Sequence, residues 1–299
     1  MTKPERRHQQ PPLQTIRVYI VTSSFSNRQL KHLLRYAVLL LVAFGVLAPL
    51  LATVLGGFKS LGDLRVNAFG LPTVWEWKNY WDILAGKRYW GLMWNSTVIA
   101  AFTVFLTVAV AAMAAYVFVH VRFFGSGFLF NYLLLGLMFP AATAILPLFI
   151  KVRDLGLLDT YWGVVLPQVA FGLASSMLLF HNYFKQMPSE LFEAAVVDGC
   201  GYFQFFWYIV LPLARPILAT VAVIVFVHSW NAYLLPLVVL NRDTLYPWPL
   251  GIMAYQGEFS TDWNLILAFI TLTILPAVLM FFAAQKHIVA GLTAGSVKG

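Results

Sequence analysis

Six long runs without a single charged side chain limit the fold of this 299-residue sequence more than any other feature. Each run is 22 to 25 residues long, and all 32 charged residues lie between or beside the runs. A helix needs ~20 apolar residues to cross the ~30 Å hydrocarbon core of a bilayer. The sequence therefore predicts an all-α membrane protein with six transmembrane helices. Their predicted bounds are 37–58, 96–119, 128–150, 161–184, 216–240 and 264–285.

The composition supports the same fold class. Hydrophobic residues make up 60% of the chain and charged residues 11%, whereas ordinary soluble domains carry roughly 25% charged residues. This balance excludes a soluble enzyme, a disordered chain and a soluble nucleic-acid binder, so we expect lipid and no nucleic acid around the protein. The single cysteine, Cys200, excludes a disulfide scaffold or a cysteine-built metal site, and we expect no bound metal.

The distribution of lysine and arginine predicts the orientation. If the N-terminus lies inside, the inner segments hold 12 basic and 4 acidic residues, and the outer segments hold 8 of each. Because basic residues favour the cytoplasmic side, we expect both termini in the cytoplasm. Residues 1–36 are then a basic and largely disordered tail, 37–285 a transmembrane domain, and 286–299 a second cytoplasmic tail. Eight of the ten tryptophans lie in or beside outer segments, as membrane anchors or as a docking surface.

The runs carry little that could drive transport by itself. Proton- and ion-coupled carriers usually need ionisable groups within the bilayer, and these runs offer only His181 and His228. A solitary histidine in a span is more often a packed residue than a proton relay. The chain also lacks the G-x-x-x-x-G-K-[ST] loop that binds ATP. We therefore expect no cofactor on this chain and an energy source in another subunit.

The segment 185–215 differs from the other connections. It is far longer than the ~2–8 residues that usually join helices in a bundle. Pro188 can open a helix, and Gly199 and Gly201 permit a sharp turn before a second short helix. The pattern predicts a cytoplasmic helix–turn–helix between the fourth and fifth spans, with apolar residues around acidic ones. Such a unit suits the groove of a partner protein.

This segment resembles the EAA loop of the permease subunits of ABC importers. The match consists of Glu193-Ala194-Ala195, three residues, Gly199, nine residues, Ile209, one residue and Leu211-Pro212. Further segments are similar to the carbohydrate branch of that family, and the end of the chain resembles a MalG-like tail. These segments are Asn95-Ser96, 155–160, Asp198-Gly199, Trp230-Asn231 and 290–299. The resemblance covers about residues 30–299.

The resemblance implies a non-catalytic permease subunit in the inner membrane of a bacterium. It implies a second permease, forming a heterodimer, two ATPase subunits that hold ATP and Mg, and an extracytoplasmic substrate-binding protein. The loop forms the coupling helix, whose ATPase-docking residues are Glu193, Ala194, Ala195, Asp198, Gly199, Ile209, Leu211 and Pro212. The C-terminal tail reaches the ATPase interface through Gly291, Thr293, Gly295 and Lys298.

The resemblance implies a carbohydrate, and an oligosaccharide in particular, as the solute. Sugars favour aromatic faces and amides, which makes Trp230, Asn231 and Tyr233 the substrate-path candidates, with interhelical packing as their alternative role. The binding protein is expected to contact the segment 241–263. Its contact candidates there are Trp248, Tyr255, Gln256 and Glu258.

Three alternatives stay open at this point. The same architecture could import glycerol phosphate or another polar organic solute. A secondary carrier or channel acting alone leaves the EAA spacing and the uncharged spans unexplained. A membrane signalling or scaffold protein could use the segment 185–215 as its interaction site, and loss or retention of uptake in a deletion strain separates it from a transporter.

Overall fold

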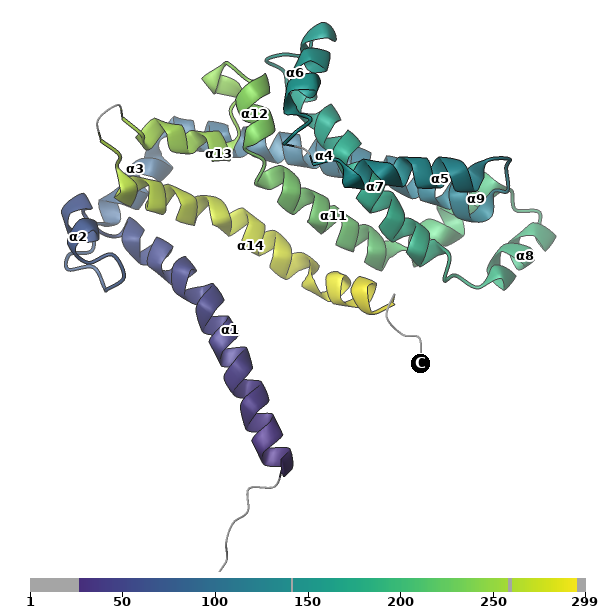
Figure 1. Cartoon of the computed structure of the whole chain (residues 1–299), viewed down its shortest axis with the longest axis horizontal. Coiled ribbons are helices and arrows are strands. Elements are labelled where there is room, and N and C mark those ends of the chain that lie inside the picture. Colours follow the sequence, from purple (N-terminus) through teal and green to yellow (C-terminus); the bar gives the residue numbers. More distant parts are fainter. Residues whose placement is uncertain (1–26, 141, 258–259, 295–299) are drawn as a thin grey trace, which may run out of the picture. The chain divides into compact units, whose positions relative to one another are not determined.

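The computed structural model describes residues 27–140, 142–257 and 260–294. Among these residues every named element is a helix, and one isolated β-bridge joins Gln256 and Thr261 (Figure 1). The chain divides into two units, residues 1–50 and residues 51–299. Each unit is described by itself below.

The first unit contains most of helix α1 (Asn27–Gly57). Its apolar side chains are exposed along the helix, and Leu40, Leu41 and Phe44 are at least 70% exposed. A helix that is apolar on every side is typical of a membrane span. Helix α1 begins ten residues before the predicted boundary at 37, so residues 27–36 are helical and do not belong to a disordered tail. Residues 1–26 of that predicted tail lie outside the described residues.

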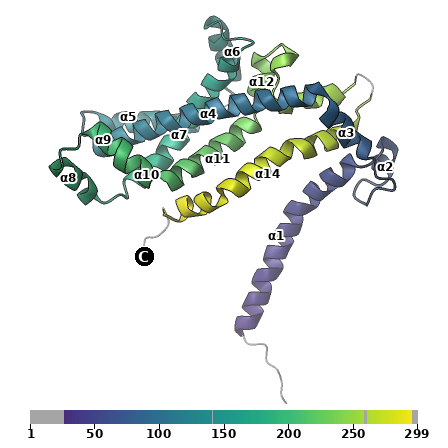
Figure 2. The ribbon, with the colours of Figure 1, turned by 180° about the vertical axis from the view of Figure 1, so that it is seen from behind.

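The second unit is built around four helices that lie side by side in Figures 1 and 2. Helix α4 packs against α7 and α11, and α11 packs against α14. Ala111, Ala112 and Ala115 are buried on α4, where small side chains let neighbouring helices approach closely. The bounds of the four helices are Lys87–His120 for α4, Tyr161–Phe184 for α7, Arg215–Trp230 for α11 and Trp263–Ala294 for α14.

Within the described part of the chain, four helices are long and apolar enough to cross a membrane, namely α1, α4, α7 and α14. A fifth is reached if Tyr202–Leu213 and Arg215–Trp230, which meet at a bend of 77°, count as one span. The prediction of uninterrupted helices holds for 161–184, which coincides with α7. Helix α14 also covers 264–285, but it continues to Ala294, into the predicted C-terminal tail.

The prediction of a continuous helix over 128–150 is wrong. The segment forms α5 (Ser126–Leu134), the 3₁₀ helix η1 (Leu135–Met138) and, after a break, α6 (Ile145–Asp154). The break follows from Pro140, because the residue before a proline is driven out of the helical region. Phe139 indeed has extended backbone angles, φ −87° and ψ 115°.

The prediction of a continuous helix over 216–240 is also wrong. Helix α11 ends at Trp230, and α12 (Leu234–Val239) follows after a short break. Pro236 has no N–H to bond the carbonyl four residues earlier, so it cannot lie in the middle of a helix without losing a hydrogen bond. The structure places it in the first turn of α12, where that bond is not needed.

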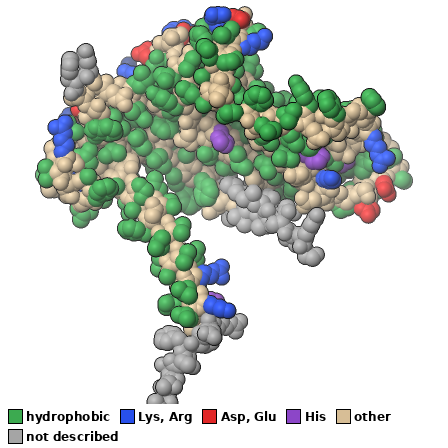
Figure 3. Space-filling view, viewed as in Figure 1, with side chains coloured by type: hydrophobic (Ala, Val, Ile, Leu, Met, Phe, Trp, Pro, Cys, Tyr) green, Lys and Arg blue, Asp and Glu red, His purple; other side chains and the backbone are tan. Residues whose placement is uncertain are grey.

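Shorter elements gather at the two ends of the bundle (Figures 1 and 2). One end carries α2 (Leu61–Val66), α3 (Trp77–Ala85), η3 (Asp243–Leu245), α13 (Trp248–Gly251) and η4 (Ile252–Tyr255). The other end carries α8 (Ser189–Val197), α9 (Tyr202–Phe205), the π-helix η2 (Phe206–Val210) and α10 (Leu211–Leu213). In Figure 3 apolar side chains cover most of the visible bundle, and charged side chains lie toward its margins.

Aromatic side chains mark the end of the bundle that carries α3. Five tryptophans there are between 47% and 71% exposed, and they are Trp75, Trp77, Trp81, Trp90 and Trp94. Tryptophan favours the membrane–water boundary, where its ring is buried in lipid and its N–H stays hydrated. Their exposure in the single chain leaves both predicted roles, anchor and docking surface, open to them.

Candidate functional site

Helix α8 ends in a turn that only a few residue types can form. The N–H of Cys200 donates to the carbonyl of Ala195 at 2.8 Å, and the N–H of Gly199 donates to the carbonyl of Val196 at 3.0 Å. These two bonds are the Schellman motif, which needs a left-handed residue directly after the helix. Gly199 occupies that position with φ +80°. The sequence prediction of a sharp turn at Gly199 is therefore confirmed.

One face of α8 is exposed. Glu193 is exposed, and Val196 and Val197 beside it are 52% and 86% exposed. Glu190 lies in the first turn, where a negative charge suits the helix dipole. Exposed apolar side chains next to a charged one are typical of a protein interface. Ala194, Asp198 and Gly199 are exposed as well, whereas Ala195 is buried.

The opposite face of α8 is anchored by aromatic rings. The ring of Phe192 packs edge-on against Phe205 at 5.0 Å between centroids and stacks on Tyr202 at 5.3 Å. His120, the last residue of α4, lies 5.5 Å from Phe205 and stacks on Tyr116 at 4.8 Å. These contacts connect α8 and α9 to the cytoplasmic end predicted for α4, so movement of α8 is passed to that helix.

The second half of the 185–215 loop is a π-helix followed by a proline. Pro212 has no N–H to donate to an earlier carbonyl, and a widened turn directly before it accommodates the loss. Ile209 and Leu211 are half-buried against the core, and Pro212 is exposed. The second part of the motif therefore lies in a continuous run of helical turns that connects α9 to α11.

The predicted C-terminal contacts lie at the limit of the described residues. Gly291 and Thr293 belong to the last turn of α14. Gly295 and Lys298 lie outside the described residues. Their predicted role at an ATPase interface stays a prediction.

The three substrate-path candidates do not share one site. Trp230 is 3% exposed, stacks on Phe226 and donates from its indole N–H to the carbonyl of Thr273 at 3.2 Å. The amide nitrogen of Asn231 donates to the carbonyl of Val227 at 2.8 Å, which closes the end of α11. Tyr233 is 46% exposed, in the break before α12. Trp230 thus packs the core, in keeping with the alternative role that the sequence left open.

The segment 241–263 is held against the bundle. Trp248 is 9% exposed, and its backbone N–H donates to the hydroxyl of Ser96 at 2.8 Å. Tyr255 is half-buried with its ring against Phe269, and burial raises the pKa of its hydroxyl. Gln256 is exposed, and Glu258 lies outside the described residues. The candidates for contact with a binding protein therefore differ in accessibility, and Gln256 is more exposed than Tyr255 and Trp248.

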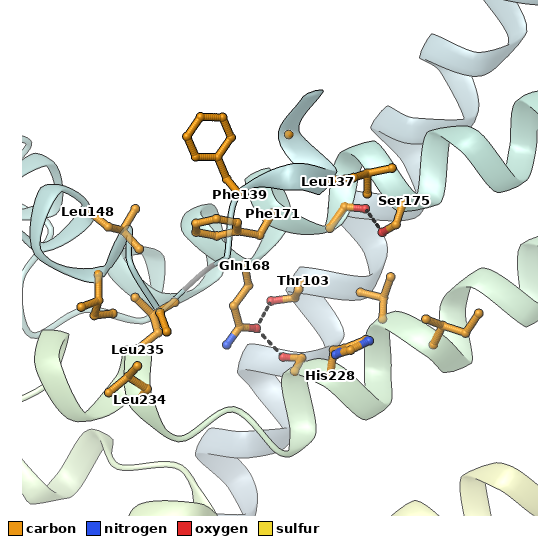
Figure 4. A pocket seen from close by; sticks show the side chains of 17 residues that line it. Thr103, Leu137, Phe139, Leu148, Gln168, Phe171, Ser175, His228, Leu234 and Leu235 are labelled. Carbon is orange, nitrogen blue, oxygen red and sulfur yellow. Dashed lines mark hydrogen bonds between the residues drawn. The ribbon is translucent and has the colours of Figure 1, made fainter. Parts of the chain in front are cut away.

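A cavity of about 390 Å³ opens between α4, α7 and α11 (Figure 4). Of its lining, the sequence analysis named only His228, although the other polar side chains inside apolar spans could have indicated the cavity as well. Apolar side chains form most of the wall. The polar residues that line it are Thr103, Gln168, Ser175, His228 and Ser229. Across the described residues, no group of three or more His, Cys, Asp or Glu side chains could hold a metal ion.

Comparisons with known proteins identify relatives over most of the chain. It is 33% identical over 264 residues to the probable ABC transporter permease protein YurM of Bacillus subtilis, covering 87% of each chain. It is 33% identical over 267 residues to the diacetylchitobiose uptake system permease protein NgcG of Streptomyces coelicolor, covering 88% of each. It is 34% identical over 262 residues to the arabinooligosaccharides transport system permease protein AraQ of Halalkalibacterium halodurans, covering 86% of this chain and 93% of the relative.

The fold has a counterpart among solved structures. A bacterial ABC transporter involved in the import of the acidic polysaccharide alginate contains a chain that superposes with a TM-score of 0.75. The two chains are 22% identical, and the match covers 87% of this chain and 97% of the other. The family model for the binding-protein-dependent transport system inner membrane component matches residues 107–293. The chain therefore belongs to the family of binding-protein-dependent transport system inner membrane components, the permease subunits of ABC importers.

Proposed function

We propose that this chain is one of two different permease subunits of an importer that carries a neutral carbohydrate, an oligosaccharide, into a bacterial cell. The family supplies the importer, and the names of two relatives supply the solute class, since they specify diacetylchitobiose and arabinooligosaccharides. An uncharged cavity wall among the described residues supports a neutral solute. ATP and Mg belong to two partner ATPase subunits, and this chain is not catalytic.

The proposed topology has six crossings with both termini in the cytoplasm. Helices α1, α4, α7 and α14 supply four crossings, and the broken segments α5–α6 and α11–α12 supply two. Irregular backbone at membrane depth is tolerated where it is buried in protein or lines a cavity. Phe139 and Ala142 in the first break, and Leu234 directly after the second, line the same cavity, which supports this assignment.

The observation that carries the proposal is the exposed face of α8. Val196 and Val197 present apolar surface around Glu193, and aromatic contacts hold the other face of the helix against the bundle. In the proposed complex this face lies in a cleft of an ATPase subunit, where Glu193 pairs with a basic side chain. ATP binding favours one arrangement of the ATPase pair, and the coupling helices pass that preference to the spans.

The ends of the chain and the segment 241–263 complete the proposed complex. Gly291, Thr293, Gly295 and Lys298 lie at the ATPase interface. An extracytoplasmic binding protein delivers the solute to the end of the bundle that carries α13. Its contacts there are Gln256, Trp248, Tyr255 and Glu258. Asn231 and Tyr233, in the break after α11, lie toward the solute path. Trp230, which packs in the core, holds this end of α11 in place.

The test is to isolate the complex and to reverse one charge on α8. The chain is purified in mild detergent from its native membrane, and the co-purifying subunits are identified by mass spectrometry. Uptake of labelled neutral oligosaccharides is then compared for wild type, Glu193→Lys and Glu190→Lys. Glu190 is the matched control, because it is an exposed acid on the same helix and lies outside the EAA motif.

We expect an ATPase, a second permease and a secreted binding protein in the purified complex. Glu193→Lys should remain in the membrane, lose association with the ATPase and lose uptake, and Glu190→Lys should retain both. Normal uptake and normal ATPase association in Glu193→Lys would contradict the docking assignment. Repeated recovery of the chain alone, under conditions that preserve a control complex, would contradict the importer assembly.

A further inference from the structure

The cavity between α4, α7 and α11 contains one amide whose two ends have different surroundings. The side-chain oxygen of Gln168 accepts a hydrogen bond from the hydroxyl of Ser229 at 2.6 Å and from the hydroxyl of Thr103 at 3.2 Å. The three residues belong to three different helices. The hydroxyls of Thr103 and Ser229 therefore both lie at the oxygen end of the amide.

The nitrogen of the same amide has no hydrogen-bond partner. It is shielded from solvent in the single chain, and it lies on the side of the amide turned away from the two hydroxyls (Figure 4). Buried N–H groups are almost always paired, because an unpaired one forfeits the hydrogen bonds it had in water. The cavity beside it is thus a place where an acceptor atom is favoured.

The cavity has the size and the lining of a small-molecule site. Its volume of about 390 Å³ lies within the ~300–1,000 Å³ range of ligand pockets, which combine apolar walls with a few placed polar groups. Phe139 and Phe171 contribute aromatic faces to the wall. His228 and Ser175 add polar groups to the wall, and the lining contains no Asp, Glu, Lys or Arg.

The position of the cavity along the spans supports a solute that crosses the membrane. Thr103 and Gln168 each lie seven residues inside the predicted start of their spans, 96–119 and 161–184, which is roughly 10 Å at 1.5 Å per residue. The breaks before α6 and before α12 both border the cavity, through Ile145 and Leu234 among others. Interrupted helices are a recurrent feature of solute sites in transporters.

We infer that Gln168 is a solute-binding residue, whose amide nitrogen donates a hydrogen bond to an oxygen of the neutral carbohydrate in this cavity. The inference rests on the proposed function and assigns a contact for that solute. A hydroxyl, ring or acetyl oxygen of a sugar supplies the acceptor, whereas the acyl chain of a lipid supplies none. An anion is disfavoured, because no fixed positive charge compensates its loss of water. Thr103 and Ser229 are positioning residues that hold the amide.

The experiment measures contact directly, by protection of a cysteine at this position. Gln168→Cys is made in a Cys200→Ser background, assembled with the partner subunits in lipid vesicles, and labelled with N-ethylmaleimide. The probes are diacetylchitobiose, arabinotriose and maltotriose, each first tested for uptake by the wild type. Leu166→Cys is the matched control, because it lies on the same helix with its side chain exposed outside the cavity.

A transported sugar should slow the labelling of Gln168→Cys, roughly tenfold at a concentration ten times its dissociation constant, and leave Leu166→Cys unchanged. Should Gln168→Cys not assemble with the ATPase subunits, His228→Cys on the wall of the same cavity takes its place. A second measurement compares uptake by Gln168→Met, which keeps the side-chain length without the donor, and by Asn182→Leu. Asn182 is the control, because it carries an exposed amide on the same helix and does not line the cavity.

We expect Gln168→Met to lower the uptake rate of the transported sugar about three- to tenfold, the effect of one lost hydrogen bond, with ATPase association intact. Asn182→Leu should match the wild type. Unslowed labelling in the presence of a transported sugar would overturn the inference and leave the proposed function standing. Labelling blocked equally with and without sugar, and relieved by removing lipid, would identify a lipid occupant and also overturn it. No uptake of any of the three sugars by the wild type would contradict the carbohydrate assignment itself and, with it, this inference.

Discussion

The hydroxyl of Tyr116 donates a hydrogen bond to the backbone carbonyl of Tyr202, 2.7 Å away and 86 residues later in the chain. Tyr116 lies near the end of α4, and Tyr202 is the first residue of α9. The bond therefore connects a membrane helix to the unit that presents Glu193. His120, whose ring stacks on Tyr116 and also contacts Phe205, adds a second connection between α4 and the 185–215 loop.

Removing that bond should loosen the loop. Tyr116→Phe keeps the ring contacts and deletes the hydroxyl, which costs about 1 kcal/mol of local stability. We expect faster hydrogen exchange at the backbone amides of 189–205 and a lower ratio of solute transported to ATP hydrolysed. Tyr132→Phe, the same change at an exposed tyrosine of α5, is the control. Unchanged exchange in Tyr116→Phe would show that the ring contacts alone hold the loop.

The turn at Gly199 should discriminate between substitutions by backbone preference alone. A Cβ built at Gly199 meets nothing within 4 Å, so steric contact with neighbours is absent there. In Gly199→Val the left-handed backbone is destabilised by roughly 1–2 kcal/mol, whereas asparagine tolerates that conformation. We expect Gly199→Val to lose ATPase association and uptake and Gly199→Asn to retain most of both. Equal loss in the two variants would indicate that the ATPase requires a residue without a side chain.

Asn95 should be among the side chains on which stability depends most strongly. It is 4% exposed, its amide nitrogen donates to the carbonyls of Thr244 at 2.8 Å and Tyr246 at 2.9 Å, and its oxygen accepts from Tyr161 at 2.6 Å. Asn95→Leu removes the partner of three polar groups in part-buried hydrogen bonds, at about 1–3 kcal/mol each when no water replaces the partner. We expect a large fall in the thermal midpoint of the detergent-solubilised protein.

Tyr161→Phe is the variant with which the thermal midpoint of Asn95→Leu is compared. It removes only the hydroxyl that Asn95 accepts from, so we expect a loss of about 1 kcal/mol, several times smaller than that of Asn95→Leu. A fall of similar size in the two variants would mean that the carbonyls of residues 244 and 246 find other partners. The segment that precedes α13 would then be held by packing instead.

The carboxylate of Asp159 should make stability depend on pH in the acid range. The backbone N–H groups of Asn241 and Arg242 donate to it at 2.5 and 3.0 Å and hold its pKa below the ordinary value. Because the folded pKa is the lower one, this stabilisation is complete above the ordinary aspartate pKa of ~3.9 and is lost as the pH falls through the folded value. We expect it to be present at pH 7 and to disappear below about pH 4.

Asp159→Asn tests this dependence without disturbing the backbone. Asp159 has φ +54°, a left-handed angle that asparagine also tolerates. We expect a lower thermal midpoint than the wild type at pH 7 and a difference that closes as the pH falls below 4. Asp154→Asn, at an exposed carboxylate paired with Arg153, is the control. A difference that stays constant from pH 7 to pH 3 would show that the charge of Asp159 does not act through these hydrogen bonds.

The sequence determined the features that follow from local chemistry. In lipid, an apolar run forms a helix, because the helix pairs the backbone N–H and C=O groups that lipid cannot bond. The helical class and the bounds of α7 therefore follow directly from residues 161–184. The turn at Gly199 was equally readable, since a helix followed by glycine has few other conformations. The EAA spacing predicted docking residues on α8, in the turn after it, and in η2 and α10.

Only the tertiary structure decided the features that depend on contacts between distant segments. Hydropathy does not distinguish a continuous span from one broken at Pro140 or after Trp230, because both are equally apolar. The sequence left two roles open for Trp230, solute contact and interhelical packing, and the structure places its indole in the core. Gln168, Thr103 and Ser229 come from three helices and form a site only when those helices pack together. The physical reason lies in the hydrogen bonds. A segment forms its backbone hydrogen bonds within its own helix, so the sequence alone predicts them. A polar side chain inside the bundle finds its hydrogen-bond partner on another helix, so only the tertiary structure shows it.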